Sequence, residues 1–159
     1  MRVLFLTHYF PPEVGAPQTR IAALARGLRE RGIEVTVIVQ PIPGLGKETV
    51  TTLYRVAREA LANVVAHAQA SHAEIRLCEM DADTHDGDRM VRLAITDNGV
   101  GVDSAQLDRR SEGHLGLLLL INRVENLGGS LTVAGGPNGG TAVVATMPVN
   151  VDVADPNGD

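Results

Sequence analysis

The amino-acid sequence predicts an α/β fold, a two-layer sandwich in which helices cover one face of a mixed, mostly antiparallel sheet of about five strands. Three patterns support this class. An amphipathic helical pattern extends over residues 48–69. An alternating apolar run at 73–80 and a further strand at 90–96, joined by a polar turn, favour an antiparallel hairpin. A strand, helix and strand pattern at the start of the chain favours a short parallel βαβ unit.

Composition and charge narrow the class of protein. With 159 residues, of which 44% are hydrophobic, the chain can bury one sizeable core. The net charge of −5 argues against a general nucleic-acid surface, and no apolar window is long enough to span a bilayer. We therefore expect no nucleic-acid partner and no direct membrane contact. The single cysteine, Cys78, excludes an internal disulfide and a cysteine-based zinc site, which fits a cytoplasmic location.

The first part of the chain reads as a strand, a helix and a second strand. Residues 2–7 are a short apolar run followed by a proline-stiffened loop, as expected of a buried strand. Residues 17–31 carry an apolar helical face, and Gly32 is a typical helix stop. Residues 33–39 form the next strand. The first loop of such a unit often lies near a phosphate, which is a weak functional signal.

The long helix, which follows a proline- and glycine-rich break at 41–46, carries a row of polar residues. Glu59, Asn63 and His67 recur at every fourth position along the margin of an apolar stripe. A carboxylate, an amide and an imidazole at the rim of a core can contact a half-buried polar ligand such as a magnesium-bound triphosphate. A helix with a plain polar border is the alternative. The apolar stripe comprises Leu53, Val56, Ala57, Ala60, Leu61, Val64, Val65 and Ala68.

Two glycine-containing segments add further candidates. A strand runs directly into Asp97, and Gly99 and Gly101 follow. This order puts an acceptor beside a backbone that can approach a planar ligand, with a tight turn after an edge strand as the alternative. The segment from Gly113 to Gly116 precedes an apolar helix, whose free N-terminal amides suit a phosphate.

The remaining segments complete the predicted sheet. The acidic run at 81–88 is interpreted as a solvated turn rather than as a cation site. The apolar helix at 117–127 ends at two glycines and is followed by strands at 130–134 and 141–147. Residues 148–159 have the composition of a frayed tail.

The opening of the chain resembles a known family. MRVLFLTHYFPPEVGAPQTRIAALARGLRERG followed by EVTV is similar to the start of a retaining glycosyltransferase with two Rossmann-like domains. In that family Gly15 would lie in the loop that faces the sugar-nucleotide diphosphate. Because the rest of the chain does not follow that family, glycosyl transfer is the least favoured function.

A second resemblance covers residues 33–149. The segments LYRVAREALANVVAHA, ITDNGVG, GHLGL, RVENLGG and GGTAVVATMP resemble the ATP-binding domain of sensor histidine kinases. The wider superfamily includes DNA gyrase and mismatch-repair ATPases. The resemblance implies a domain that binds Mg-ATP as the catalytic ATP-binding domain of a sensor histidine kinase in two-component signal transduction.

The same resemblance assigns residues to the phosphate side of the site. Asn63 would ligate the magnesium ion that bridges the phosphates, and Glu59 would help to polarise the attacking group or an ordered water. His67 would lie near the phosphates, with packing or capping as its alternative role. The loop next to the phosphates would consist of Gly113, His114, Leu115 and Gly116.

The resemblance also assigns the adenine side. Asp97 would accept a hydrogen bond from the adenine amino group. Gly99 and Gly101 would let the chain pass close to the base, and Thr141 would contact the adenine side through its hydroxyl or a water. ATP and Mg²⁺ are therefore the expected ligands.

The two resemblances together imply a hybrid chain. We expect a glycosyltransferase-like βα opening at 1–32, an ATP-binding domain at 33–149 and a flexible tail at 150–159. The strand at 33–39 fits the pattern of both families. Kinases of this family carry a helical hairpin with the phospho-accepting histidine just before this domain, where this chain has the other opening.

The expected partners follow from that departure. They are ATP and, in a parent kinase, a phosphoacceptor helical hairpin or a response regulator. Because no acceptor hairpin is recognisable, turnover by the chain itself is uncertain from the sequence. The alternatives are a nucleotide-binding module without turnover and a partner-switching serine kinase, followed by a glycosyltransferase fragment.

Overall fold

The structure of the chain is a computed structural model that describes residues 17–80, 89–102, 115–136 and 139–149. Several sequence-based predictions lie outside these ranges. They are the strand at 2–7 with Gly15, the acidic turn at 81–88, Gly113 and His114, and the tail from residue 150.

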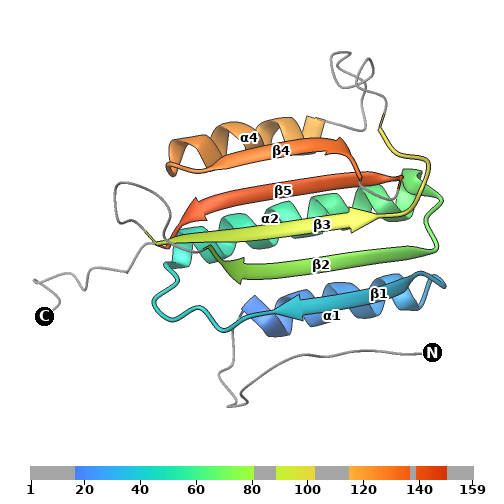
Figure 1. Cartoon of the computed structure of the whole chain (residues 1–159), viewed down its shortest axis with the longest axis horizontal. Helices are drawn as coiled ribbons and strands as arrows, with labels where there is room; N and C mark the ends of the chain where they lie inside the picture. Colours follow the sequence, from blue (N-terminus) through green and yellow to red (C-terminus); the bar gives the residue numbers. More distant parts are fainter. Residues whose placement is uncertain (1–16, 81–88, 103–114, 137–138, 150–159) are drawn as a thin grey trace, which may run out of the picture.

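Five strands form one mixed sheet within the described ranges (Figure 1). They are β1 (Glu34–Val39), β2 (His72–Glu79), β3 (Met90–Asp97), β4 (Ser130–Gly135) and β5 (Thr141–Pro148). Their order across the sheet is β1-β2-β3-β5-β4. β1 and β2 pair in parallel, whereas the other three neighbouring pairs are antiparallel. The predicted hairpin is the β2–β3 pair.

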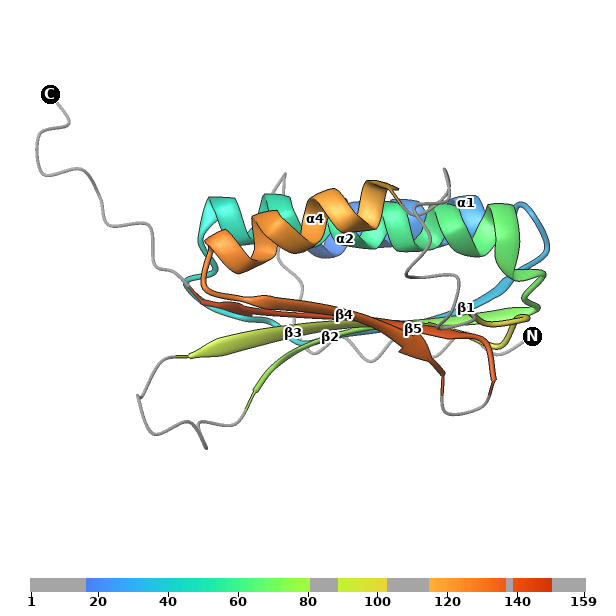
Figure 2. The same cartoon turned by 90° about the horizontal axis from the view of Figure 1, so that it is seen from above.

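The described helices all lie on one face of this sheet, as Figure 2 shows. α1 (Pro17–Arg29) contacts β1 and α2 (Lys47–Asn63), and α2 in turn contacts β3 and β5. α4 (Leu115–Asn126) packs beside α2 and against β4. None of the helices in the described ranges is long and apolar enough to cross a bilayer. The predicted two-layer sandwich is confirmed.

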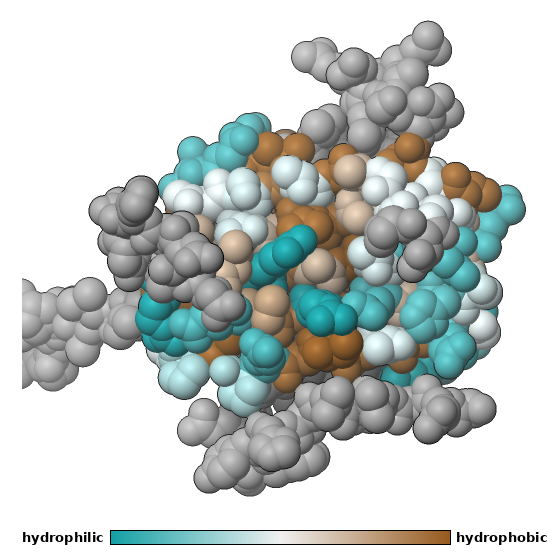
Figure 3. All heavy atoms as spheres, in the orientation of Figure 1, coloured by the Kyte–Doolittle hydropathy of each residue, from teal (hydrophilic) through white to brown (hydrophobic). Residues whose placement is uncertain are grey.

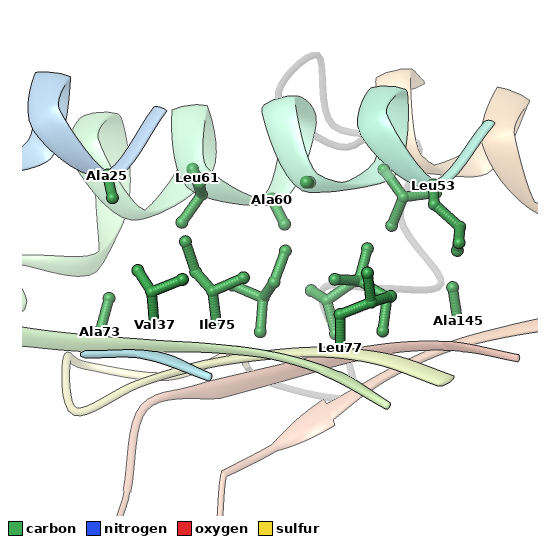
Figure 4. Close-up of a cluster of buried hydrophobic side chains, with 14 of the residues drawn as sticks. Ala25, Val37, Leu53, Ala60, Leu61, Ala73, Ile75, Leu77 and Ala145 are labelled. Carbon is green, nitrogen blue, oxygen red and sulfur yellow. The ribbon is translucent and has the colours of Figure 1, made fainter. Parts of the chain in front are cut away.

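The core lies between the two layers and consists of aliphatic side chains. Alternate residues of β1, β2, β3 and β5 turn toward the helices and are buried. In Figure 4, Leu61 and Ala60 of α2 point toward Val37 and Ile75 of the sheet. The small alanines on α2 allow the helix to approach the sheet closely, and Ala57 has no exposed surface.

The opposite face of the sheet is covered by none of the described helices and has mixed polarity (Figure 3). One row across this face contains Ile38, Arg76, Ala94 and Val144, which are register partners on neighbouring strands. Antiparallel sheets commonly leave one face to solvent in this way. The candidate residues on α2 therefore lie on the other side of the sheet.

Polar contacts fasten α2 to its neighbours. Thr49 Oγ1 donates a hydrogen bond to the Pro148 carbonyl oxygen at 3.2 Å. Arg123 of α4 donates from Nε to Thr52 Oγ1 at 3.2 Å, and its Nη2 lies 3.7 Å from Glu48 Oε2. Because both threonines are fully buried, these contacts satisfy hydroxyl groups that water cannot reach. They tie the first half of α2 to β5 and to α4.

The long helix departs from its predicted geometry near its end. The α-helix ends at Asn63, and the next residues form a short π-helix, η1 (Val64–Ala68), before Gln69 adopts a left-handed φ of 51°. A π-turn bonds residue i to i+5 and so rotates the following side chains off an α-helical face. Val65, which was predicted to be buried, is 37% exposed, and this prediction is wrong. The other residues of the predicted stripe are buried.

Candidate functional site

Asp97 is the last residue of β3 and turns toward the helix layer. It follows the alternation of Val91, Leu93 and Ile95 and is only 7% exposed. Its Oδ1 accepts a hydrogen bond from the Gly99 amide at 2.8 Å. A carboxylate can accept several hydrogen bonds, and no Lys, Arg or His in the described ranges forms an ion pair with Asp97. The buried carboxylate therefore retains acceptor capacity for a ligand.

Glycines on both sides bring the backbone close to Asp97. Gly140 has a φ of 71°, and a methyl group at this position would overlap the carbonyl oxygen and Oδ1 of Asp97. Gly101, with a φ of 80°, lies against the carbonyl oxygen of Gly140. Thr141 begins β5, which is antiparallel to β3, so Thr141 lies at the same end of the sheet as Asp97. Among the described residues, glycine backbone therefore lies directly against Asp97.

The turn after β3 rests on the end of η1. The Val100 amide donates a hydrogen bond to the Ala68 carbonyl oxygen at 2.8 Å. A methyl group at Gly99 would overlap that same carbonyl group. Glycine is therefore required at position 99 by close approach of two backbones. The helix that carries the polar row is held against the turn that follows Asp97.

The first turn of α4 lies against Glu59. Gly116 is the second residue of α4, and a methyl group built on it would overlap the half-buried Glu59 carboxylate. A helix N-terminus carries partial positive charge and attracts carboxylates and phosphates alike. The Glu59 carboxylate thus lies at the start of α4.

Asn63 and His67 differ in their placement. Asn63 lies one turn beyond Glu59 on the same face of α2 and is half-buried. His67 lies in η1, where the winding changes, and is exposed. The structure brings Glu59, Asn63 and Gly116 to one part of the site, whereas a position of His67 near the phosphates stays a prediction.

The donor set fits a magnesium ion that arrives with phosphates. Within the described ranges, no cluster of three or more His, Cys, Asp or Glu side chains could hold a metal ion by itself. Magnesium usually takes one or two protein oxygens and completes its shell with waters and phosphate oxygens. The Asn63 amide oxygen and the Glu59 carboxylate are oxygen ligands of this kind on one half-buried helix face.

The structure describes only some of the predicted site residues. Gly113 and His114 lie outside the described ranges, and Leu115 is the first residue of α4. Two residues that shape the site are absent from the predicted set. Gly140 could have been found from the Gly-Gly-Thr sequence before the last strand, because paired glycines there indicate close backbone approach. Asn98 could not, because its hydrogen-bond partners are distant in sequence.

The family is decided by a profile match. Residues 48–151, more than half of the chain, match the family described as histidine kinase-, DNA gyrase B-, and HSP90-like ATPase. The chain belongs to this ATPase family. The match includes Glu59, Asn63, Asp97 and Thr141, so that the described site lies within the ATPase domain.

The curated relatives of this ATPase domain are sensor kinases. The chain is 32% identical over 100 residues to the histidine-protein kinase/phosphatase DegS of Brevibacillus brevis, covering 63% of the chain and 23% of DegS. It is 32% identical over 107 residues to the nitrate/nitrite sensor NarX of Escherichia coli, covering 67% of the chain and 16% of NarX. The sensor histidine kinase NarS of Mycobacterium tuberculosis is 38% identical over 98 residues, which is 61% of the chain and 21% of NarS. The chain spans less than a quarter of each of these relatives.

Solved structures show the same fold. The mycobacterial sensor histidine kinase MprB superposes with a TM-score of 0.63 at 23% identity, covering 84% of this chain and 96% of that one. The ATP-binding domain of PrrB from Mycobacterium tuberculosis superposes with a TM-score of 0.58 at 24% identity, covering 82% and 92%. The chain is therefore an ATP-binding catalytic domain of the sensor histidine kinase type. The glycosyltransferase resemblance of residues 1–39 receives no support from these comparisons.

Proposed function

We propose that the domain binds ATP together with Mg²⁺ and presents the γ-phosphate to an acceptor in two-component signal transduction. The adenine amino group would donate to Asp97. The phosphates would lie beside Asn63, next to the contact between Glu59 and the first turn of α4. The phosphate loop would include Gly113, His114, Leu115 and Gly116, and Thr141 would contact the adenine side.

The observation that carries this proposal is the buried Asp97 carboxylate with glycine backbone on both sides. A buried carboxylate is costly unless donors satisfy it, and only the Gly99 amide does so among the described hydrogen bonds. An adenine amino group would supply a further donor, and the glycines let the backbone approach Asp97 closely. The related fold of full-length ShkA, with a TM-score of 0.65, is known in complex with AMPPNP, an ATP analogue.

Asn63 and Glu59 would have different roles at the phosphates. In this proposal, the Asn63 amide oxygen holds Mg²⁺, which neutralises charge on the phosphates. Glu59 accepts a proton or a hydrogen bond from the attacking group or from an ordered water. The start of α4, which contacts Glu59, would add the positive end of its dipole near the phosphates.

The test is a titration with a fluorescent ATP analogue, with and without Mg²⁺. We expect Asn63→Ala to weaken binding by about 1–3 kcal/mol in the presence of Mg²⁺, the cost of a lost ligand to a charged group. Without Mg²⁺ the mutant and parent should bind alike. Asn126→Ala, at the exposed C-terminal end of α4, is the matched control. A mutant that binds Mg-ATP as tightly as the parent would exclude Asn63 as the metal ligand.

The phosphoryl acceptor would be a separate helical hairpin or a response regulator of a parent kinase. Transfer requires a nucleophile in line with the γ-phosphate, and none of the described histidines meets this condition. His72 lies on the open face of the sheet, away from α2, and contacts Thr36 and Glu34. His67 is carried by η1 at the end of the site helix itself.

We therefore expect the chain to bind ATP without phosphorylating itself on histidine. Incubation with γ-labelled ATP should leave no acid-labile, base-stable label on the chain. Label that is lost when His8, His67, His72, His85 or His114 is replaced would contradict this expectation. Supplying an acceptor hairpin in trans separates a catalytic domain from a nucleotide-binding module without turnover.

The glycosyltransferase-like opening is tested separately. We infer no donor-sugar binding from residues 1–39, because the matched family begins at residue 48 and accounts for the site. Titration with a sugar nucleotide should therefore show no saturable binding, and saturable binding at micromolar concentration would reinstate that resemblance.

A further inference from the structure

We propose that Asn98 is a positioning residue for the nucleotide site, which joins the adenine end of the site to the end of the helix that carries Asn63. This inference rests on the proposed function and extends it to a residue outside the nucleotide contacts. Asn98 follows Asp97 directly, and its side chain is exposed rather than turned toward the core.

The Asn98 side chain forms three hydrogen bonds to the chain that leaves η1. Its Oδ1 accepts from the amides of Ser71 at 3.0 Å and of His72 at 2.9 Å. Its Nδ2 donates to Ser71 Oγ at 3.0 Å. The Asn98 amide also donates to the His72 carbonyl oxygen at 3.2 Å. Both polar atoms of the Asn98 side chain are thus hydrogen-bonded to the consecutive residues Ser71 and His72.

These bonds act where the site helix ends. η1 ends at Ala68, and the next residue, Gln69, has a left-handed φ of 51°, which is uncommon for a residue other than glycine. The groups beyond it take their partners from the turn after β3. Val100 supplies the donor for the Ala68 carbonyl, and Asn98 supplies the acceptor for Ser71 and His72. The turn therefore caps the helix end from a distant part of the sequence.

The same turn holds Asp97 and Gly99 in place. Gly99 contacts both Asp97, through its amide, and Ala68, through close backbone approach. A shift of the η1 end would move the turn, the Asp97 acceptor and the Asn63 end of α2 relative to one another. The Asn98 hydrogen bonds hold the turn against the end of η1. They would therefore fix the distance between Asp97, the proposed adenine acceptor, and Asn63, the proposed metal ligand.

The experiment compares three variants of the whole chain by titration with a fluorescent ATP analogue in Mg²⁺. Asn98→Ala removes all side-chain bonds and should weaken ATP binding about tenfold, the effect of about 1.4 kcal/mol. Asn98→Asp keeps an acceptor for Ser71 and His72 and should bind within about twofold of the parent. Ser71→Ala removes only the hydroxyl that accepts from Nδ2, and should also bind within about twofold.

Hydrogen exchange in the unmutated protein provides a measurement that does not depend on a folded mutant. The amides of Ser71, His72 and Val100 should exchange slowly, and Mg-ATP should slow them further, because nucleotide and junction stabilise the same arrangement. Fast exchange that ATP leaves unchanged would overturn the proposal. So would an Asn98→Ala variant that binds like the parent, or an Asn98→Asp variant as weak as Asn98→Ala. A parent that binds no ATP would overturn the proposed function as well, whereas the other outcomes leave that function intact.

Discussion

Gly140 lies so close to Asp97 that a single added methyl group would overlap the aspartate carbonyl oxygen and Oδ1. The contact joins the turn before β5 to the end of β3. It leaves the Asp97 side chain flanked by backbone on one side and by the Gly99 amide on the other. The surroundings of the Asp97 carboxylate therefore depend on Gly140 and Gly99.

Gly140→Ala should destabilise the protein more than Gly139→Ala does. Both glycines have positive φ, 71° and 82°, but only Gly140 has a neighbour that a methyl group would overlap. Gly139→Ala should cost about 1–2 kcal/mol for the left-handed backbone alone. Gly140→Ala should cost about 1–3 kcal/mol more from overpacking and should also weaken ATP binding. Urea unfolding and nucleotide titration measure the two effects, and equal costs for both variants would refute the contact.

Gly116→Ala should gain less stability than the helix propensity of alanine predicts. The methyl group would overlap the carboxylate at the end of the flexible Glu59 side chain, so that Glu59 must turn away, and this should offset part of the gain of about 0.5–1 kcal/mol. Gly27→Ala is the matched control, because this glycine in α1 has space around it. It should stabilise the protein by about 0.5–1 kcal/mol. If both variants are stabilised equally in urea unfolding, the approach of α4 to Glu59 is not as described.

Asp97→Asn should reduce the preference for ATP over GTP. The amide replaces an acceptor with a donor next to the adenine amino group, whereas guanine carries a carbonyl at that ring position. We expect the free energy of ATP binding to become less favourable by about 1–3 kcal/mol, and that of GTP binding to change less. Competition titrations with ATP and GTP measure the ratio of the two affinities. Glu125→Gln, at an exposed position of α4, is the control. An unchanged ratio of affinities would remove Asp97 from the adenine role.

Arg123→Ala should destabilise the helix layer through Thr52. The mutation leaves a fully buried hydroxyl without the guanidinium donor, at a cost of about 1–3 kcal/mol. Glu48→Ala removes only the exposed partner of Arg123 and should cost about 0–1 kcal/mol. Urea unfolding compares the two. A Glu48 effect as large as that of Arg123 would assign the stabilisation to the ion pair instead.

The pKa of the Glu79 carboxyl should lie below its ordinary value of 4.5, because Arg89 donates hydrogen bonds to it. Since the folded pKa is lowered, any stability from this pair is present above pH 4.5 and is lost as pH falls through the lowered pKa. Arg89→Ala should return the pKa of Glu79 toward 4.5, as followed by NMR titration. An unshifted Glu79 in the parent would contradict the pairing.

Local sequence patterns determined most of the fold and part of the site. Alternation predicted β2, and its apolar residues Ile75 and Leu77 are buried, because a strand has a period of two whatever lies beside it. The helical period likewise predicted the buried stripe of the long helix, with the exception of Val65. The chemical types of Asp97, Asn63 and Glu59, together with their motifs, predicted an ATP-binding domain, in agreement with the family match.

Tertiary packing alone decided the features that join distant segments. Val65 is exposed because the helix changes to π winding where its end meets the turn after β3, which no local pattern in the helix signals. The contacts of Gly116 with Glu59 and of Gly140 with Asp97 depend on how α4 packs on α2 and β5 on β3. A residue's own sequence neighbours carry periodicity and turn preference, but the identity of its partner across the fold is set only when the layers pack together.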